Sequence, residues 1–490
     1  MLRFRVSSII TMVLLLGCSP AATISSRPAT STPPPSAGAA AIVGAYFEAF
    51  NSGDPNKMLA FRRDHWSHRV PWLADPWLVG EYDVKRALAG TLTPRSIQPD
   101  PEGLDALART ADGDWFRVHF SFEAEPPHKI VEGRMRCVAA PPDEGGGPRN
   151  DAELVQAARA FAARLTQKEV FSGVVLIARN GVPLLLEAFG PADREHGIAN
   201  RLDTKFNLGS MNKMFTAIAI AQLVNAGKLA YADTVSQVLP GELPETLGSI
   251  TVDELLTHTA GLGDAFEQRY FANRSAFRTP RDFIQVFGND PPAARGQWRY
   301  SNFGYIVLGR IIERVSGTTY DDFVRTHIFE PAKMTDTGAF DADADVPHRA
   351  LPYTPFRDQE PPRAAARNVA HLLPMKGTPA GGGYSTAPDL LRFAQAFTAD
   401  KIVPAATRKL LTTGNVTMSE AHPNERYGYG MIVRTTNGLL HVGHGGTWPG
   451  INAIFEIVPD RGYAIVVLAN HEMPAADRVA TRILSWIAGM

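Results

Sequence analysis

Cysteine is scarce in this sequence, which has only Cys18 and Cys137 among its 490 residues. Cys18 lies at the end of an apolar N-terminal stretch, where export signals are processed. If that residue is modified, Cys137 has no partner within the chain. The fold therefore cannot depend on an internal disulfide, even in an oxidising compartment.

An excess of either charge is also missing. The chain has 49 Lys and Arg against 50 Asp and Glu, a net charge of -1, and no long basic or acidic run. Nucleic-acid binding requires clustered lysine and arginine, so nucleic acid is excluded as the main partner. The composition, 44% hydrophobic and 20% charged, is typical of a globular protein, and the length predicts two folded units.

The apolar stretch at residues 9–16 is too short to span a bilayer as a mature helix, but it suits a signal peptide behind Arg3 and Arg5. It ends in LLGC, which resembles the bacterial lipoprotein box. We therefore expect residues 1–17 to be a lipoprotein signal peptide and Cys18 to be lipidated and anchored in the membrane. The alternative is an ordinary secretory signal cut near residue 21 or 22. The serine after the cysteine favours an extracytoplasmic place, at the periplasmic face of the outer membrane.

Two stretches with little hydrophobic content divide the rest of the chain. Residues 18–40 are mostly Ser, Pro, Ala and Thr and are expected to be a flexible tether, and residues 139–150 form a second linker. The unit between them, residues 41–138, begins with a helical pattern and continues with two alternating stretches, DWFRVHFSFEAE and HKIVEGRMRCV. The alternation predicts neighbouring antiparallel strands.

A helix followed by a curved sheet resembles the nuclear-transport-factor-2-like (ketosteroid-isomerase-like) cone, a small α+β domain used for ligand binding, catalysis and dimerisation. His65, His68, Asp64 and Asp114 are candidates to line a pocket in it, although scattered surface polar residues are the favoured interpretation. His65 and His68 also form a possible zinc pair. No matching cluster accompanies them, so no metal site is expected.

The large segment, residues 151–490, has strands at both ends and helices between them. FSGVVLIARNGVPLLLEAFG predicts two strands joined by a tight turn at Asn180 and Gly181, and alternating stretches return after residue 425 before a closing helix. Strands from both ends must pair in one antiparallel sheet, so this segment is expected to be a single domain.

Ser210 is the first candidate for chemistry. It precedes a long apolar helical run, and Lys213 follows on the same helical face one turn later. A hydroxyl at the positive end of a helix with an amine in reach is an activated-nucleophile arrangement. The alternative is a helix cap beside a solvated charge, since one Ser-x-x-Lys is expected by chance in a chain of this length.

Two further elements carry candidate residues. Tyr300 and Asn302 precede another apolar helix. The tyrosine could act as a base near the lysine, and Asn302 could bind a substrate amide or orient Lys213. The alternative is a tyrosine buried in the core and an asparagine that caps the helix. LLHVGHGGTWPG, residues 439–450, is a strand before a turn, and its glycines would let a substrate lie against the strand edge. His441 and His444 are three residues apart on that strand and so face opposite sides, which argues against joint metal binding.

Together these elements resemble the serine β-lactamase and penicillin-binding-protein superfamily, closest to class C enzymes and their esterase and D-amino-acid peptidase relatives. The family order is Ser-x-x-Lys, Tyr-x-Asn, then Lys-Thr-Gly or His-x-Gly, found here at residues 210–213, 300–302 and 444–446. Residues 250–264 and 381–394 are also similar, and the resemblance covers about residues 155–488. It implies a mixed α/β (α+β) fold: a five-stranded antiparallel sheet flanked by helices, with a helical insertion and no metal or organic cofactor.

The resemblance also implies roles for single residues. Ser210 attacks a substrate carbonyl while Lys213 and Tyr300 remove and relay its proton. The backbone N–H groups of Ser210 and Thr447 form the oxyanion hole, and Asn302 binds the acyl side chain. The resulting acyl-enzyme is hydrolysed by water, with Tyr300 helping as base.

One departure from the family pattern affects the expected substrate. His444 and Gly445 replace the Lys and Thr of Lys-Thr-Gly, before the shared Gly446, and His444 is assigned to substrate binding with Gly446. A neutral histidine in place of a fixed cation should weaken carboxylate binding by about 1–3 kcal/mol. We therefore expect weak or no β-lactam hydrolysis, and small esters or D-residue cell-wall peptides as substrates.

Other interpretations remain open at this point. The chain could be a DD-carboxypeptidase or a β-lactamase proper, a non-hydrolytic sensor that retains its acyl group, or a scaffold for a function in residues 41–138. GYSTA at residues 383–387 is one residue short of a Gly-x-Ser-x-Gly elbow, and Thr386 with Asp389 fits a helix start better.

Overall fold

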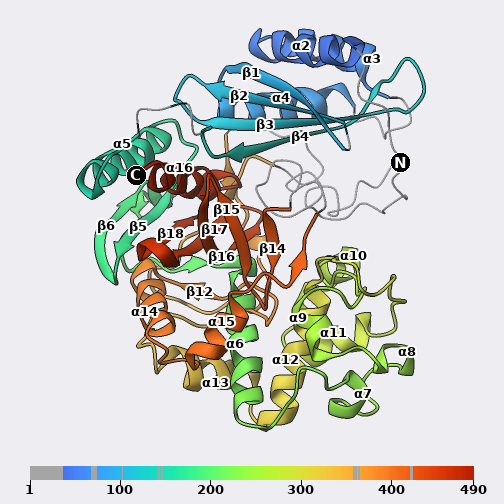
Figure 1. Ribbon diagram of the computed structural model, residues 1–490, viewed down its shortest axis with the longest axis vertical. Coiled ribbons are helices and arrows are strands. Elements are labelled where there is room, and N and C mark those ends of the chain that lie inside the picture. The colour runs from blue at the N-terminus through green and yellow to red at the C-terminus, as the bar shows by residue number, and fades with distance from the viewer. Residues whose placement is uncertain are drawn as a thin grey trace.

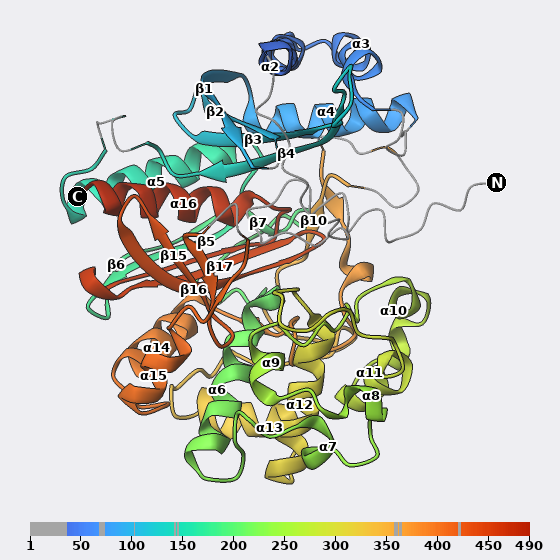
Figure 2. The ribbon, with the colours of Figure 1, turned by 45° about the vertical axis from the view of Figure 1, so that its right-hand side comes forward.

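The computed structural model describes residues 37–67, 74–101, 103–141, 144, 147–356, 361, 365–419 and 423–490. The expected signal peptide, Cys18 and His68 lie outside these ranges. Figures 1 and 2 show three stacked parts: an α+β layer from the N-terminal third, a large sheet with helices against it, and a mostly helical half.

The N-terminal layer consists of three helices and one antiparallel sheet in the order β1-β2-β3-β4. Its elements are α2 (Ala37–Asn51), α3 (Pro55–His65), α4 (Asp75–Ala89), β1 (Leu92–Asp100), β2 (Gly103–Thr110), β3 (Trp115–Phe122) and β4 (Ile130–Val138). The expected pairing of the last two strands is present, with Phe116 opposite Cys137. Helix α2 begins inside the expected tether of residues 18–40, because AGAAA is a strong helix-forming run.

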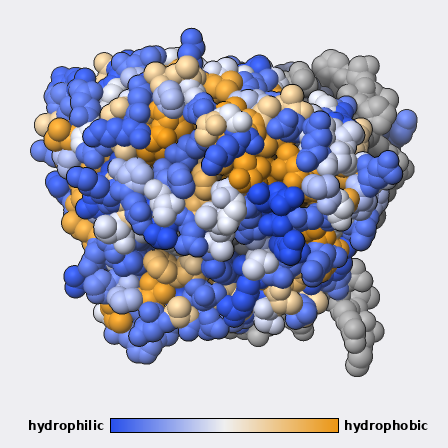
Figure 3. Space-filling view, turned by 90° about the horizontal axis from the view of Figure 1, so that it is seen from below, coloured by the Kyte–Doolittle hydropathy of each residue, from blue (hydrophilic) through white to orange (hydrophobic). Residues whose placement is uncertain are grey.

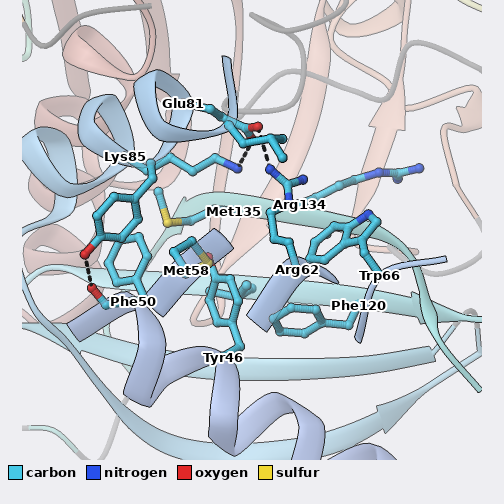
Figure 4. Close-up of a pocket in the computed structure, with 14 residues that line it drawn as sticks. Tyr46, Phe50, Met58, Arg62, Trp66, Glu81, Lys85, Phe120, Arg134 and Met135 are labelled. Carbon is cyan, nitrogen blue, oxygen red and sulfur yellow. Dashed lines mark hydrogen bonds and ion pairs between the residues drawn. The ribbon is translucent and has the colours of Figure 1, made fainter. Parts of the chain in front are cut away.

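A pocket opens between the helices and the sheet of this layer (Figure 4). Aromatic and apolar side chains line most of it, and Glu81 lies at one end between Arg62 and Lys85, at 2.9 and 2.5 Å. Burial raises the pKa of the Glu81 carboxyl, but Lys85 and Arg62 outweigh it and lower the pKa to about 2.

The candidates named from the sequence do not line this pocket, which holds for the described members His65, Asp64 and Asp114. Asp64 is exposed, in agreement with the favoured interpretation of scattered surface polar residues, whereas Asp114 is buried. The ring of His65 packs on Phe61, with ring centroids 4.8 Å apart. Asp114 faces away from the pocket, into the contact with the C-terminal helix. The pocket is lined instead by mostly aromatic and apolar residues of the three helices and of strands β3 and β4.

The central sheet has eight strands in the order β13-β14-β15-β16-β17-β18-β5-β6. β18 pairs with β5 along its full length, which joins the two ends of residues 151–490 as the sequence predicts. The strands are β5 (Gly173–Arg179), β6 (Val182–Phe189), β13 (Val416–Thr417), β14 (Glu425–Tyr427), β15 (Ile432–Thr436), β16 (Leu439–Trp448), β17 (Ile451–Val458) and β18 (Tyr463–Ala469).

The sheet therefore has the expected class and topology but more strands than the five expected. RYGYGMIVR, which alternates like one strand, is split into β14 and β15 by residues 428–431, where Gly430 has a φ of 68°. A Cβ on Gly430 would lie 2.6 Å from the Lys213 carbonyl oxygen. The break thus follows from close contact with the helix that carries Lys213.

Helices cover both faces of the sheet (Figures 1 and 2). On one face lie α5 (Asp151–Gln167) and α16 (Ala475–Gly489), and on the other face lie α6 (Asn212–Asn225), α14 (Ala387–Thr398) and α15 (Ala405–Leu411). Thr386 caps α14 through Asp389 N–H at 3.3 Å, as predicted.

The rest of the helical half forms the end of the molecule that Figure 3 shows from below, where hydrophilic side chains cover most of the face and hydrophobic ones gather in separate areas. Its helices are α7 (Val235–Val238), α8 (Glu245–Gly248), α9 (Val252–Leu256), α10 (Gln268–Ala272), α11 (Pro280–Phe287), α12 (Asn302–Ser316) and α13 (Tyr320–Val324). The structure also contains two-stranded pairings: β7 (Pro191–Asp193) with β8 (Ile198–Ala199), β9 (Phe206–Asn207) with β12 (Tyr384–Ser385), and β10 (Tyr353–Thr354) with β11 (Arg367–Asn368). In the described part of the chain, no helix is long and apolar enough to cross a bilayer.

Helix α16 lies between the central sheet and the N-terminal layer, and both contribute to one hydrophobic core around it. A buried ion pair crosses the contact: Arg478 donates to Asp114 at 2.8 Å and to the Leu88 carbonyl oxygen at 2.6 Å. Both charged side chains are about 4–5% exposed. The N-terminal layer is therefore packed firmly against the larger domain.

Candidate active site

Ser210 lies in a tight 3-10 turn, Gly209–Met211, that leads directly into helix α6. Gly209 has a φ of 50°, and its N–H donates to the Asn207 side chain at 2.9 Å. The turn places Ser210 at the N-terminal end of the helix, where backbone N–H groups lack intrahelical acceptors. The helix start expected from the sequence is therefore correct, and the serine is partly exposed at that start.

Lys213 is fully buried on the first turn of α6. Its Nζ lies 3.3 Å from Ser210 Oγ, 2.7 Å from Asn302 Oδ1 and 2.6 Å from the Ala380 carbonyl oxygen. Burial lowers the pKa of the amine to about 7, and the charge of Asp264 opposes that shift only in part. A solvated surface lysine, the alternative weighed for this pair, is ruled out by this burial.

The three contacts of Lys213 match the bonding capacity of a neutral amine. Asn302 Oδ1 and the Ala380 carbonyl oxygen are acceptors, so they take the two N–H donors of the neutral form. The lone pair is then left for the third contact, Ser210, whose hydroxyl can donate. This arrangement allows the neutral form of the Lys213 amine to accept the Ser210 proton.

Tyr300 and Asn302 reach the same point from the start of α12. The Ser210 hydroxyl is near enough to the Tyr300 hydroxyl to favour its ionised form, and Lys213 Nζ lies 4.7 Å from the centre of the Tyr300 ring. Burial raises the pKa of Tyr300 well above its usual range, so the phenol is neutral at rest. Asn302 orients Lys213, one of the two roles proposed for it, and donates to Asp264 at 2.9 Å.

Sequence reasoning missed His258, a buried residue that packs against Tyr300 and the start of α12. It is 1% exposed with a φ of 59°, and its Nδ1 accepts the backbone N–H of Ser301 at 3.1 Å. Its ring centroid lies 4.5 Å from that of Tyr300. A signal was available, because the stretch 250–264 that resembles the family contains this histidine, but no pattern of spacing assigned it a role.

Strand β16 brings the third motif of the sequence, residues 444–446, beside Ser210. β15 pairs with β16 only as far as Gly443, so residues 444–448 present an edge that β15 does not cover. A Cβ on Gly446 would lie 1.8 Å from the Leu208 carbonyl oxygen and 2.9 Å from Ser210 N, and a Cβ on Gly209 would lie 2.6 Å from Thr447 N. The backbone N–H groups expected to form an oxyanion hole, those of Ser210 and Thr447, are thus brought close together.

His444 lies deeper than its expected place at the substrate-binding surface. Its side chain is 3% exposed, and Nε2 lies 3.3 Å from the Tyr427 hydroxyl. Burial and the charge of Lys213 lower its pKa to about 3, so it is neutral, as predicted, but it supports Tyr427 and does not form an open substrate surface. Packing also explains the glycine at position 446, because its backbone lies too close to Leu208 for a side chain.

The histidines of β16 point to different partners, as the strand spacing predicts. His441 Nδ1 lies 3.0 Å from Glu456 on the face opposite His444. Among the described residues, one group has metal-compatible spacing, namely Asp100, Asp105 and His119 on the N-terminal sheet. His119 is 2.8 Å from Asp105 and 3.1 Å from Ser121 Oγ, so these groups already have protein partners.

Comparison with known proteins identifies the class. The family model described as Beta-lactamase matches residues 157–489, more than half of the chain, and the chain belongs to this family. Its mixed α/β architecture, with an antiparallel sheet flanked by helices, is the β-lactamase/transpeptidase-like fold, and the chain is a serine hydrolase of that family.

Individual relatives support the same grouping. The chain is similar to the putative penicillin-binding protein PbpX of Bacillus subtilis, 33% identical over 62% of this chain and 72% of the relative. It is also similar to esterase EstB of Burkholderia gladioli, 28% identical over 63% of this chain and 88% of the relative. Among solved structures, a penicillin-binding protein from Bacillus halodurans superimposes with a TM-score of 0.58 at 28% identity, covering 68% of this chain and 98% of the other.

Proposed function

We propose that this protein hydrolyses esters or amides through an acyl-enzyme on Ser210. The observation that carries the proposal is the Lys213 amine, buried and 3.3 Å from Ser210 Oγ, with its other two contacts taken by acceptors. An amine with a pKa of about 7 is matched to proton transfer near neutral pH.

The steps follow from the positions of these groups. Lys213 takes the Ser210 proton as Oγ attacks the carbonyl carbon, and the oxyanion is held by Ser210 N–H and Thr447 N–H. Tyr300 passes its proton to the leaving alcohol or amine and takes back the proton held by Lys213, so both groups end in their resting protonation states. Water then attacks the acyl-enzyme, and the same groups return Ser210 to its resting state.

Esters are the favoured substrates within this proposal. His444 is neutral and buried, so the strand edge offers no fixed cation at this position for a substrate carboxylate. β-Lactams and D-alanyl-D-alanine peptides both carry that carboxylate. The similarity to an esterase supports the ester interpretation, and the similarity to penicillin-binding proteins keeps a DD-peptidase as the second candidate.

The test is time-resolved hydrolysis of p-nitrophenyl acetate and butyrate by the purified chain and by Ser210→Ala, with intact mass measured during turnover. We expect steady turnover, a transient acyl adduct on Ser210, and a loss of at least about 10³-fold in kcat in the variant. Equal rates in the two proteins would overturn the proposal, and a single persistent adduct would favour the non-hydrolytic sensor.

We further propose that the chain is an exported lipoprotein held at the periplasmic face of the outer membrane through Cys18, and that the N-terminal layer is nuclear-transport-factor-2-like. The sequence pattern at residues 9–18 supports the first, and the order of helices and strands supports the second. Detergent partitioning of the wild type beside Cys18→Ala tests the anchor; a variant that remains in the membrane fraction would contradict it.

A further inference from the structure

Asp264 is an exposed carboxylate beside the catalytic groups, and the mechanism above does not use it. It accepts the Asn302 side-chain N–H at 2.9 Å, and Asn302 in turn contacts Lys213 at 2.7 Å. Its negative charge acts on both Lys213 and Tyr300, raising the pKa of each. Asp264 is therefore part of the electrostatic environment in which a bound substrate would lie.

The position of Asp264 is fixed by the backbone around it. The Ser301 hydroxyl donates to the Gly263 carbonyl oxygen at 2.7 Å, which ties this loop to the start of α12. The Phe266 N–H donates to the same carboxylate oxygen, Oδ1, that Asn302 contacts, at 3.0 Å. Among the residues that the structure describes, Asp264 has no ion-pair partner, and its second oxygen is available to a ligand.

The charges around the reacting serine leave Asp264 as the dominant one. His258 and His444 are neutral because burial lowers the pKa of each far below 7. Lys213 is half protonated near pH 7 and must be neutral to act as a base. In the productive state these four groups together carry one negative charge, on the carboxylate of Asp264.

We propose that Asp264 makes the enzyme select acyl groups that carry an ammonium, such as aminoacyl esters, over neutral acyl groups, and exclude acyl groups that carry a carboxylate. An ammonium placed beside Asn302 would meet the free oxygen of Asp264 in a charge-assisted hydrogen bond. A carboxylate in the same place would be repelled. The inference rests on the proposed function, because it specifies the substrate class of that site.

Two series of methyl esters test the proposal at pH 7, where the amines are mostly protonated. The short series is methyl alaninate, methyl isobutyrate and monomethyl methylmalonate, in which an ammonium, a methyl and a carboxylate occupy one position. The long series is methyl 4-aminobutanoate, methyl pentanoate and monomethyl glutarate. Because an ammonium also changes the intrinsic reactivity of an ester, the quantity compared is the ammonium-to-methyl ratio of kcat/KM in wild type and variant.

Asp264→Asn is the informative variant, because an asparagine oxygen can still accept from Asn302 and Phe266. We expect the ammonium-to-methyl ratio to fall about tenfold or more in at least one series, and the carboxylate ester to improve relative to the methyl ester. Glu267→Gln is the matched control: it removes the same charge three residues away, from a side chain already paired with Arg269, and should leave the ratios unchanged.

The outcomes separate this inference from the proposed function. If the ammonium-to-methyl ratio is equal in wild type and Asp264→Asn, the proposed selection by Asp264 is overturned. A decrease of the ratio in Glu267→Gln as large as that in Asp264→Asn overturns it too. If methyl isobutyrate and methyl pentanoate are hydrolysed with dependence on Ser210 but without a role for Asp264, only this inference fails. If the wild type hydrolyses none of these esters in a way that depends on Ser210, the proposed function is overturned as well.

Discussion

At the scale of single residues, the protonation state of Lys213 controls the proposed chemistry. An isolated lysine has a pKa of 10.5, and burial among apolar side chains lowers it to about 7 here. Between pH 7 and 10.5 the folded chain therefore binds fewer protons at this site than the unfolded chain. The contribution of Lys213 to stability accordingly rises with pH across that window. Protein stability is thus traded for an amine that is neutral near physiological pH.

The activity should follow the same titration. We expect kcat/KM for a neutral ester to rise with pH through a midpoint near 7 and then level off, because the neutral amine is the active form. Since Asp264 raises the pKa of Lys213, Asp264→Asn should move this midpoint to lower pH. Initial rates of wild type and variant from pH 5 to 9 provide the check. An identical midpoint in both would show that another group controls the rise of kcat/KM with pH.

At the scale of elements, the approach of strand β16 to the turn before α6 builds the site. Gly446 packs its backbone against Leu208 and Ser210, where any side chain would overlap the Leu208 carbonyl oxygen at 1.8 Å. The neighbouring Gly445 is less confined, since a Cβ there would meet only the Ile454 side chain, at 3.0 Å, and the Ala453 carbonyl oxygen, at 3.5 Å. One of the two glycines therefore sets the geometry of the proposed oxyanion hole.

These two positions form a matched pair of substitutions. Gly446→Ala should lower kcat by about 10²-fold or more, because displacing β16 separates Thr447 N–H from Ser210 N–H. Gly445→Ala should keep most of the activity, because the end of the Ile454 side chain can move. Kinetics with p-nitrophenyl butyrate, with circular dichroism to verify folding, distinguish them, and equal losses in both variants would argue against the assigned geometry.

At the scale of the whole molecule, one hydrophobic core joins the N-terminal layer to α16 and the sheet. The ion pair between Arg478 and Asp114 is buried within that contact. Removing one partner of such a pair typically costs about 3–5 kcal/mol, because the other charge is left without compensation. The two parts should therefore unfold together rather than as separate domains.

Arg478→Ala should accordingly lower the melting temperature by several degrees and make the chain more sensitive to proteolysis near residues 139–150. Arg159→Ala, which breaks the exposed pair with Glu187, should change stability by less than about 1 kcal/mol. Calorimetry and limited proteolysis of both variants test this. Two separate transitions in the wild type, or equal effects of the two substitutions, would contradict a shared core.

Much of this molecule could be predicted from local patterns in the sequence. The tight turns at Asn180 and Asn437 have positive φ values of 51° and 49°, as Asn-Gly pairs predict, because those residues tolerate the left-handed region. The start of the helix after Ser210, the pairing of the chain's two distant strand sets, and the pair of Ser210 with Lys213 also follow from spacing. Each depends on periods of 2 or 3.6 residues that the chain itself carries.

Other features depended on contacts between segments far apart in the chain, and only the tertiary structure decided them. The depth of His444, the support of Tyr300 by His258 and the split of β14 from β15 all arise where distant backbones meet. The same holds for the lowered pKa of Lys213, since burial is a property of everything packed around the amine. The sequence by itself determined which groups stand one helical turn or one strand apart, whereas packing determined which of them are buried, neutral and within hydrogen-bonding distance.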